Sequence, residues 1–308
     1  MKPGRLDPAL EPADAWRQAV AGECATAVAW LAGRDEASSV RAVHQARRAC
    51  KRLRALLRIA EPALGETAVE ARRWVAVSAR QLAPARDATV RAATLAAVLA
   101  EYREVLGEEA CAALEATYAI EAPHEVPPQA RDDASATLEA LADLLDDSAL
   151  RQLSRRSLLR GGRLAYRRAR RRWRAVRKAP SPEGWHELRS AVQVHLNQLK
   201  ALRECTGGRL RARGRKLARL ASLLGEAHDL WMLHASLAEA PQGSLGTLLR
   251  PVLADREHAL YAAAADLAAE LFSRRPKAFE ARLEQAWVDA TLAREAVIRD
   301  ADGLDPEA

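Results

Sequence analysis

The chain has 308 residues, of which 49% are hydrophobic and only 4% aromatic, and its formal net charge is +7. This length and apolar content suffice for a large core, and abundant Ala, Leu and Arg with little Gly or Pro favour helix almost throughout. The N-terminal segment MKPGRLDPAL has no apolar stretch, and no apolar run reaches the length of a membrane span. We therefore expect a cytoplasmic protein without a membrane anchor.

Helical periodicity recurs along the whole chain, and no segment has the pattern of a strand. Helices are predicted near residues 12–33, 37–60, 66–83, 86–120, 132–146, 149–178, 182–205, 209–225, 228–239, 244–273 and 277–299. The clearest linker is APHEVPPQAR, residues 122–131. The sequence thus predicts an all-α fold of two antiparallel helical bundles, residues 1–121 and 132–308.

The four cysteines are Cys24, Cys50, Cys111 and Cys205, and none of them forms a CxxC pair. Each lies in an apolar, helix-like segment. We expect reduced core residues, which excludes a disulfide framework and a CxxC zinc site.

The first basic helix has the sequence VHQARRACKRLRALLRI, residues 43–59. Its apolar stripe includes Val43, Cys50 and Leu57. The neighbouring stripe holds His44, Arg47, Lys51, Arg54 and Arg58, flanked by Arg48 and Arg52. Like charges at this spacing repel by roughly 0.2–0.5 kcal/mol per pair, and no acid lies between residues 40 and 60. An anion or an acidic surface is expected to face this stripe.

A second basic helix is predicted at 149–178, and no acid occurs between residues 150 and 182. Beside its apolar stripe lie Arg160, Arg163, Arg167, Arg170, Arg174 and Arg177. If the two bundles pack with their basic stripes facing each other, a basic central groove or pore results. Guanidinium groups bind phosphate oxygens in bidentate fashion, so we expect phosphate-bearing or sulfate anions as ligands.

A weak internal repeat supports two related halves. The segment WHELRSAVQVHLNQLKAL at 185 is similar to the segment at 43, so that His186 aligns with His44 and Arg189 with Arg47. A second similarity relates LAPARDATV, which begins at residue 82, to LGEAHDLWML, which begins at residue 224. The Arg86–Asp87 and His228–Asp229 pairs are interpreted as helix starts, where a carboxylate is favourable.

These segments, together with SARQLAPARDATV, YRRARRRWRAV and RRPKAFEARLEQAW, resemble the CHAD family, the conserved histidine α-helical domain. The resemblance implies two helical bundles with pseudo-twofold symmetry around a basic cavity. It also implies binding of inorganic polyphosphate, sometimes at polyphosphate granules. By position, this role passes to His44, Arg47, Lys51, Arg52, Arg54, Arg58, Arg80, Arg167, Arg170, Arg174, His186, Arg189, Lys200, Arg213 and Lys216. Arg48 and Arg163 of the basic faces complete the candidate site.

The sequence departs from the family pattern in its second half, where Gln193, Val194 and Leu196 stand at positions that are often basic. No segment resembles the triphosphate-tunnel domain that precedes many CHAD domains. Hydrolase activity of such a domain is therefore not implied.

Two alternatives stay open: a nucleic-acid-associated protein using the same stripes, and a polyphosphate-metabolising enzyme. The basic faces carry few exposed aromatic residues for base stacking, and no nucleic-acid reader motif is evident. No P-loop, G-x-S-x-G or HExxH motif is present. We therefore expect a binder without catalytic residues, cofactor or metal. His195, on an apolar stripe, is interpreted as a core histidine whose ring nitrogens are satisfied by hydrogen bonds.

Overall fold

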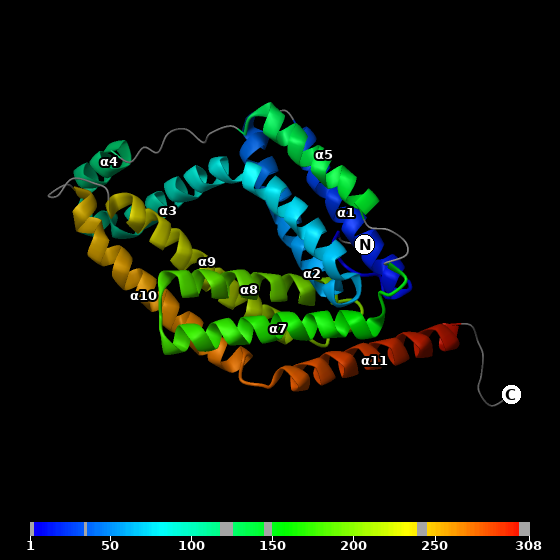
Figure 1. Ribbon diagram of the computed structural model, residues 1–308. Helices are drawn as coiled ribbons and strands as arrows, with labels where there is room; N and C mark the ends of the chain where they lie inside the picture. Colours follow the sequence, from blue (N-terminus) through cyan, green and yellow to red (C-terminus); the bar gives the residue numbers. More distant parts are fainter. Residues whose placement is uncertain (1–2, 34–35, 118–125, 145–149, 239–244, 302–308) are drawn as a thin grey trace.

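The computed structural model describes residues 3–33, 36–117, 126–144, 150–238 and 245–301, and within them it contains helices and no strand (Figure 1). The all-α prediction is confirmed. The helices are α1 (Pro12–Ala32), α2 (Glu36–Gln81), α3 (Ala83–Leu106), α4 (Glu108–Thr117), α5 (Pro128–Leu144), α7 (Arg155–Lys178), α8 (Pro182–Ala201), α9 (Arg211–Ala238), α10 (Leu245–Leu271) and α11 (Pro276–Ala301).

Glycines decide where two of the helices bend or end. Helix α2 joins two predicted helices and is kinked at Gly65, whose φ of 54° and ψ of −127° lie in a region that side chains with a Cβ disfavour. Gly107, at φ 81°, ends α3 within the predicted helix 86–120. The predicted break between residues 225 and 228 is wrong, because α9 runs through Gly225 without interruption. A lone helical glycine costs only about 1 kcal/mol relative to alanine, so it does not by itself stop a helix.

Serine caps fix the starts of the two helices that follow the linker-rich middle of the chain. Ser154 and Ser157 form a reciprocal capping box at α7, and the Ser181 hydroxyl accepts a hydrogen bond from the Gly184 backbone at α8. Each cap satisfies an amide that the first turn leaves unpaired. The caps thereby determine the residues at which α7 and α8 begin.

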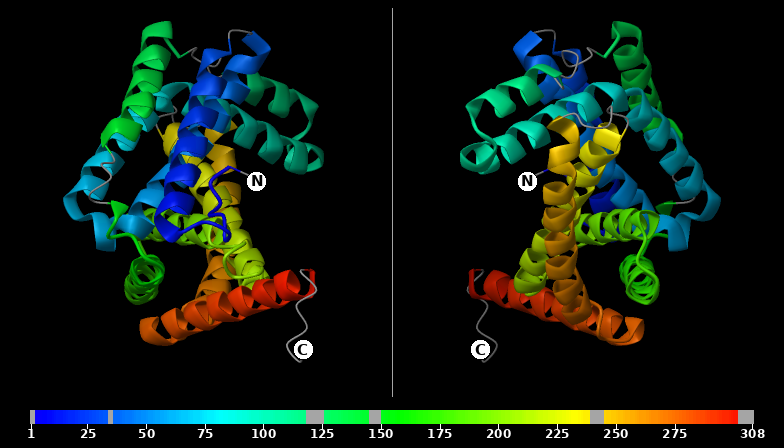
Figure 2. Two further views of the ribbon diagram at one scale, coloured as in Figure 1. Left: turned by 90° about the vertical axis from the view of Figure 1, so that its right-hand side faces the viewer. Right: turned by 90° about the vertical axis from the view of Figure 1, so that its left-hand side faces the viewer.

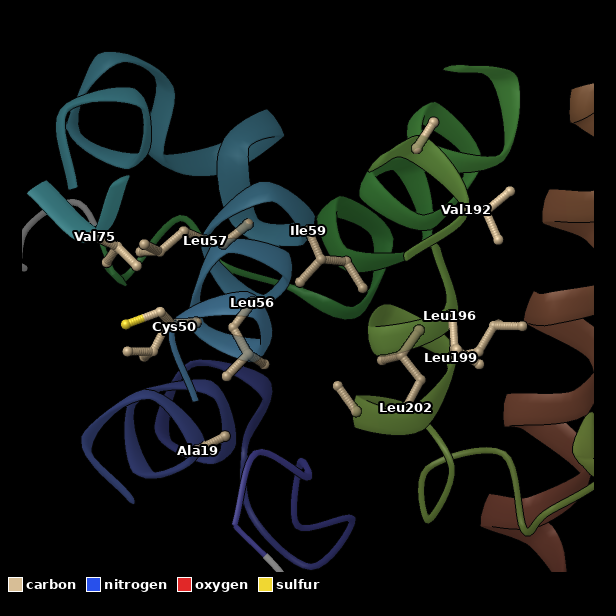
Figure 3. Packing of buried hydrophobic residues seen from close by; sticks show 14 of the residues in the cluster. Ala19, Cys50, Leu56, Leu57, Ile59, Val75, Val192, Leu196, Leu199 and Leu202 are labelled. Carbon is tan, nitrogen blue, oxygen red and sulfur yellow. The ribbon is translucent and has the colours of Figure 1, made fainter. Parts of the chain in front are cut away.

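The core follows the long helix α2, which packs against α1, α3, α5, α7 and α8 (Figures 1 and 2). Figure 3 shows Leu57 and Val75 close together on one side of α2, with Ile59 on the other side, towards α7. The main buried cluster includes residues of both predicted bundles, from Leu6 to Trp287. A smaller cluster joins α3, α4, α9 and α10. The expected division at residues 122–131 and the pseudo-twofold relation stay predictions, and residues 118–125 lie outside the described part.

Two close approaches place the basic helices next to one another. A Cβ at Gly161 of α7 would lie 1.9 Å from the backbone oxygen of Ile59, so only glycine allows this crossing of α7 over α2. Helix α8 is tied to α2 by the side-chain amides of Asn197 and Gln198, which donate to the carbonyls of Lys51 and Ala55 at 3.4 and 3.3 Å. Helices α7 and α8 therefore both pack directly against α2.

Among the described residues, no helix combines the length and the apolar character that crossing a membrane would require.

Candidate functional site

A basic groove lies between α2 and α8. It consists of two adjoining cavities of about 770 and 330 Å³ that share Lys51, Arg54, Arg189 and Ser190 in their walls. Because the same four residues border both, we treat the two cavities as one binding region. We call it the central groove, with a histidine end (770 Å³) and an arginine end (330 Å³).

The arginine end is lined by seven cationic side chains and no acidic one. They are Lys51, Arg54, Arg58, Arg72, Arg73, Arg168 and Arg189. Ser190 and Gln193 supply further polar groups, and Val69, Ala76 and Val194 complete the lining. Such a wall offers several hydrogen-bond donors and no carboxylate that would compete with an anion for them.

The positive charges at the arginine end repel one another. Burial, followed by the nearby guanidinium groups of Arg72 and Arg168, lowers the pKa of Arg58 to about 10. The pKa of Arg168 is lowered by burial and then by Arg172, Arg171 and Arg72. Arg72 pairs at 3.1 Å with Glu61, which does not itself line the cavity. A bound anion would relieve this repulsion.

The histidine end holds His44, His186 and His228 beside Arg47 and Arg48. The rings of His186 and His228 lie 5.0 Å apart between centroids. Burial lowers the pKa of His228 to about 4, with further contributions from Arg189, His186 and Lys51. Three acids, Glu183, Glu187 and Asp229, also line this end, and Glu187 pairs with Arg172 at 2.6 Å. This end is therefore less positive than the arginine end.

Backbone contacts hold the wall formed by α2. The guanidinium of Arg47 donates to the carbonyl of Ala79 at 2.7 Å, near the C-terminal end of the same helix. This bond joins the two halves of α2 on either side of the kink at Gly65. Arg58 precedes the kink and Arg72 follows it, yet both reach the same cavity.

Residues 18–238 match the family model for the CHAD domain. The chain belongs to the CHAD family. No curated protein and no solved structure matches the chain. The matched region includes α2, α7, α8 and most of α1, whereas α10, α11 and the segment RRPKAFEARLEQAW lie beyond it.

Eight of the candidate residues line the central groove of this CHAD-family protein. They are His44, Arg47, Arg48, Lys51, Arg54, Arg58, His186 and Arg189. Most come from the first basic helix, and two come from the start of α8. The structure thus brings together the two histidine segments that the sequence repeat aligned.

Other candidates have partners elsewhere. Arg52 pairs at 2.5 Å with Glu23, whose side chain is fully buried. Arg163 pairs with Glu280 of α11 at 3.0 Å, and Lys216 pairs with Glu270. Lys200 lines a separate cavity. Arg80, Arg167 and Arg174 are exposed and line neither end of the groove.

Arg170 and Arg213 bind the C-terminal end of α10. Arg170 donates to the carbonyl of Phe272 at 2.9 Å, and Arg213 donates to that of Leu271 at 2.6 Å. The guanidinium of Arg213 also lies over the ring of Tyr166, 5.3 Å from its centroid. Cations are favourable at a helix C-terminus, where carbonyls are unpaired. These two arginines hold α10 against α7 and α9.

Sequence reasoning missed five of the arginines and histidines that line the groove: Arg72, Arg73, Arg91, Arg168 and His228. Arg168 lies within the basic run of α7 but on the flank of the apolar stripe opposite to Arg163 and Arg170. His228 is not at a helix start, since α9 begins at Arg211. His195 is fully buried, as its apolar stripe predicts, but neither ring nitrogen has a hydrogen-bond partner among the described residues.

No group of three or more His, Cys, Asp or Glu side chains that could hold a metal ion occurs in the described part of the chain.

Proposed function

We propose that this CHAD-family chain binds inorganic polyphosphate in the central groove. The observation that carries the proposal is the arginine end, where seven cationic side chains from α2, α7 and α8 converge without an acid. Arg and Lys bind phosphate oxygens through charge-assisted hydrogen bonds. A linear polymer of phosphates places one negative group after another, which suits two adjoining cavities with shared cationic residues more closely than a single phosphate does.

The aromatic residues of the groove favour a ligand without bases. Tyr261 already stacks on Trp185, with centroids 4.4 Å apart, and Trp231 stacks on His228 at 5.9 Å. Proteins that bind single-stranded nucleic acid present aromatic faces to successive bases. Here the arginine end has no aromatic residue in its lining.

The proposal assigns binding, and no bond cleavage, to the groove. Phosphoryl transfer usually relies on Mg²⁺ held by carboxylates. The three acids of the groove lie at its histidine end, and one of them, Glu187, is already paired with Arg172. Chain shortening on incubation with polyphosphate and Mg²⁺ would contradict this part of the proposal.

A pair of double charge reversals tests the site. Arg54→Glu with Arg168→Glu changes two exposed residues of the groove, and Arg167→Glu with Arg174→Glu changes two exposed residues outside it. Both variants alter the net charge equally. In a titration with long-chain polyphosphate, we expect the first to lose at least about tenfold in affinity, or ~1.4 kcal/mol, and the second to lose much less. Circular dichroism checks that helicity is unchanged.

Equal losses in the two variants would indicate general charge attraction and no defined site. A DNA duplex of matched charge, titrated at two salt concentrations, provides the second comparison. Both ligands should bind more weakly at higher salt because counterions are released on binding. Preference for DNA would favour the nucleic-acid alternative over polyphosphate.

A further inference from the structure

We propose that a second site, at the junction of α8 and α9, binds a small amphipathic anion: a single alkyl or acyl chain that ends in a phosphate or carboxylate. The site is a cavity of about 220 Å³ beside the turn that joins the two helices. It is separate from the central groove, since no residue lines both. The inference therefore does not depend on polyphosphate binding.

The lining combines an apolar floor with a cationic rim. Leu196, Leu199, Leu210 and Ala218 form the apolar part, and Lys200, Arg203, Arg211 and Arg215 supply the positive charge. No acidic residue lines the cavity. An apolar chain is favoured by burial against the leucines, and an anionic head group is favoured by the guanidinium groups at the rim. A purely inorganic anion would leave the apolar floor unused.

Further cations lie close to the rim. Burial lowers the pKa of Lys200, and Arg48 and Arg52 lower it further. The one hydroxyl in the lining, that of Thr206, is already engaged with the carbonyls of Leu202 and Arg203, each at 3.1 Å. The head group is therefore expected to contact cations.

Gly214 lines the cavity. It lies within α9, where glycine is less favourable than alanine by about 1 kcal/mol. Its φ is not positive, and a Cβ built on it would meet no atom within 4 Å. Neither backbone conformation nor packing therefore requires glycine here. The missing side chain leaves space beside Leu210 and Ala218, and glycine commonly occurs where a ligand approaches the backbone closely.

The size of the cavity limits the ligand to one slender chain. Its volume of about 220 Å³ lies below the ~300–1,000 Å³ of pockets for drug-sized ligands. A two-chain lipid or a folded peptide would exceed it. The expected ligand is therefore a free single-chain amphiphile.

Octyl phosphate, kept below its micelle concentration, is the probe. Calorimetric titration is expected to show that it binds at least about tenfold more tightly than ethyl phosphate, because only the longer chain reaches the apolar floor. Gly214→Leu fills the cavity and should lower the affinity for octyl phosphate at least about tenfold. The matched control is Gly225→Leu in the same helix, where a Cβ also meets no atom within 4 Å and which does not line the cavity. It should bind octyl phosphate like the unaltered protein.

Arg215→Gln removes one positive charge of the rim without filling the cavity. This substitution should weaken the binding of octyl phosphate and leave the affinity for polyphosphate within about twofold of that of the unaltered protein. Equal binding of octyl and ethyl phosphate would overturn the proposal. So would full retention of octyl phosphate binding by Gly214→Leu. Co-sedimentation with vesicles of an anionic phospholipid is a third measurement. If the unaltered protein binds the vesicles and Gly214→Leu does not, the ligand is a membrane lipid and the proposal of a free amphiphile is overturned.

Discussion

At the scale of single residues, the groove is defined by cations that lie closer together than their charges favour. The pKa of Arg58 and the pKa of Arg168 are both lowered, first by burial and then by neighbouring guanidinium groups. Interactions between charges are stronger in such partly buried surroundings than in bulk water. Phosphate groups that enter the arginine end therefore gain from attraction and also remove repulsion.

His228 gives the groove a pH dependence. The pKa of His228 is about 4 because of burial and the positive groups Arg189, His186 and Lys51 around it. A phosphate bound nearby raises this pKa, so the complex holds more protons than the free protein, and affinity for polyphosphate should rise as the pH falls from 7 towards 5. Titration calorimetry in buffers of different ionisation enthalpy measures the proton uptake. His228→Gln should reduce it, and equal uptake in both proteins would exclude His228 as its source.

His195 makes stability depend on pH. Burial lowers the pKa of His195 to about 3, with a further contribution from Arg213. In the unfolded chain a histidine titrates near 6.5. Below that pH the unfolded state binds a proton that the folded state does not, so the free energy of unfolding falls with the pH until about pH 3.

The variant His195→Leu should therefore keep its stability near pH 7.5, because the substitution removes no hydrogen bond to the described residues. It should lose less stability than the unaltered protein between pH 6.5 and pH 4. Urea unfolding at several pH values makes the comparison. Parallel curves for the two proteins would show that His195 is not the group responsible.

At the scale of helices, the site depends on how closely α7 crosses α2. Gly161 places the two backbones in direct contact at Ile59, and the kink at Gly65 folds α2 so that Arg58 and Arg72 line one cavity. Both features are properties of the backbone. They determine which face of each basic helix turns towards the groove.

Gly161→Ala should destabilise the protein by about 1–3 kcal/mol, the usual range for overpacking, because its Cβ would lie 1.9 Å from the Ile59 oxygen. Gly22→Ala is the control: Gly22 is also helical, and a Cβ there meets no atom within 4 Å. That change should raise stability by up to about 1 kcal/mol. Thermal unfolding followed by circular dichroism distinguishes the two, and equal melting temperatures would contradict the close crossing.

The sequence predicts the helices well because periodicity and caps are local. Apolar stripes identify the buried faces of α2 and α7, and Ser181 indicates the start of α8. The choice between the two flanks of a stripe is not local. Arg168 and Arg163 flank the same apolar stripe of α7, and only the positions of α2 and α11 decide that the first lines the groove and the second pairs with Glu280. The continuation of α9 through Gly225 likewise depends on its packing against α8 and α10.

At the scale of the whole molecule, positive charge is abundant, but only part of it lines the groove. The exposed side of α7 carries Arg167 and Arg174 yet borders neither end of the groove. The net charge of +7 attracts polyanions in general. Specific binding of a phosphate chain additionally requires cations that converge from several helices, as they do at the arginine end.

The most direct test of this account is a crystal structure of the protein with a short linear polyphosphate. We predict consecutive phosphates in the central groove, with contacts to Arg54, Arg58 and Arg168 at the arginine end. A chain that is ordered only along the exposed side of α7, with the groove free of phosphate, would contradict the account.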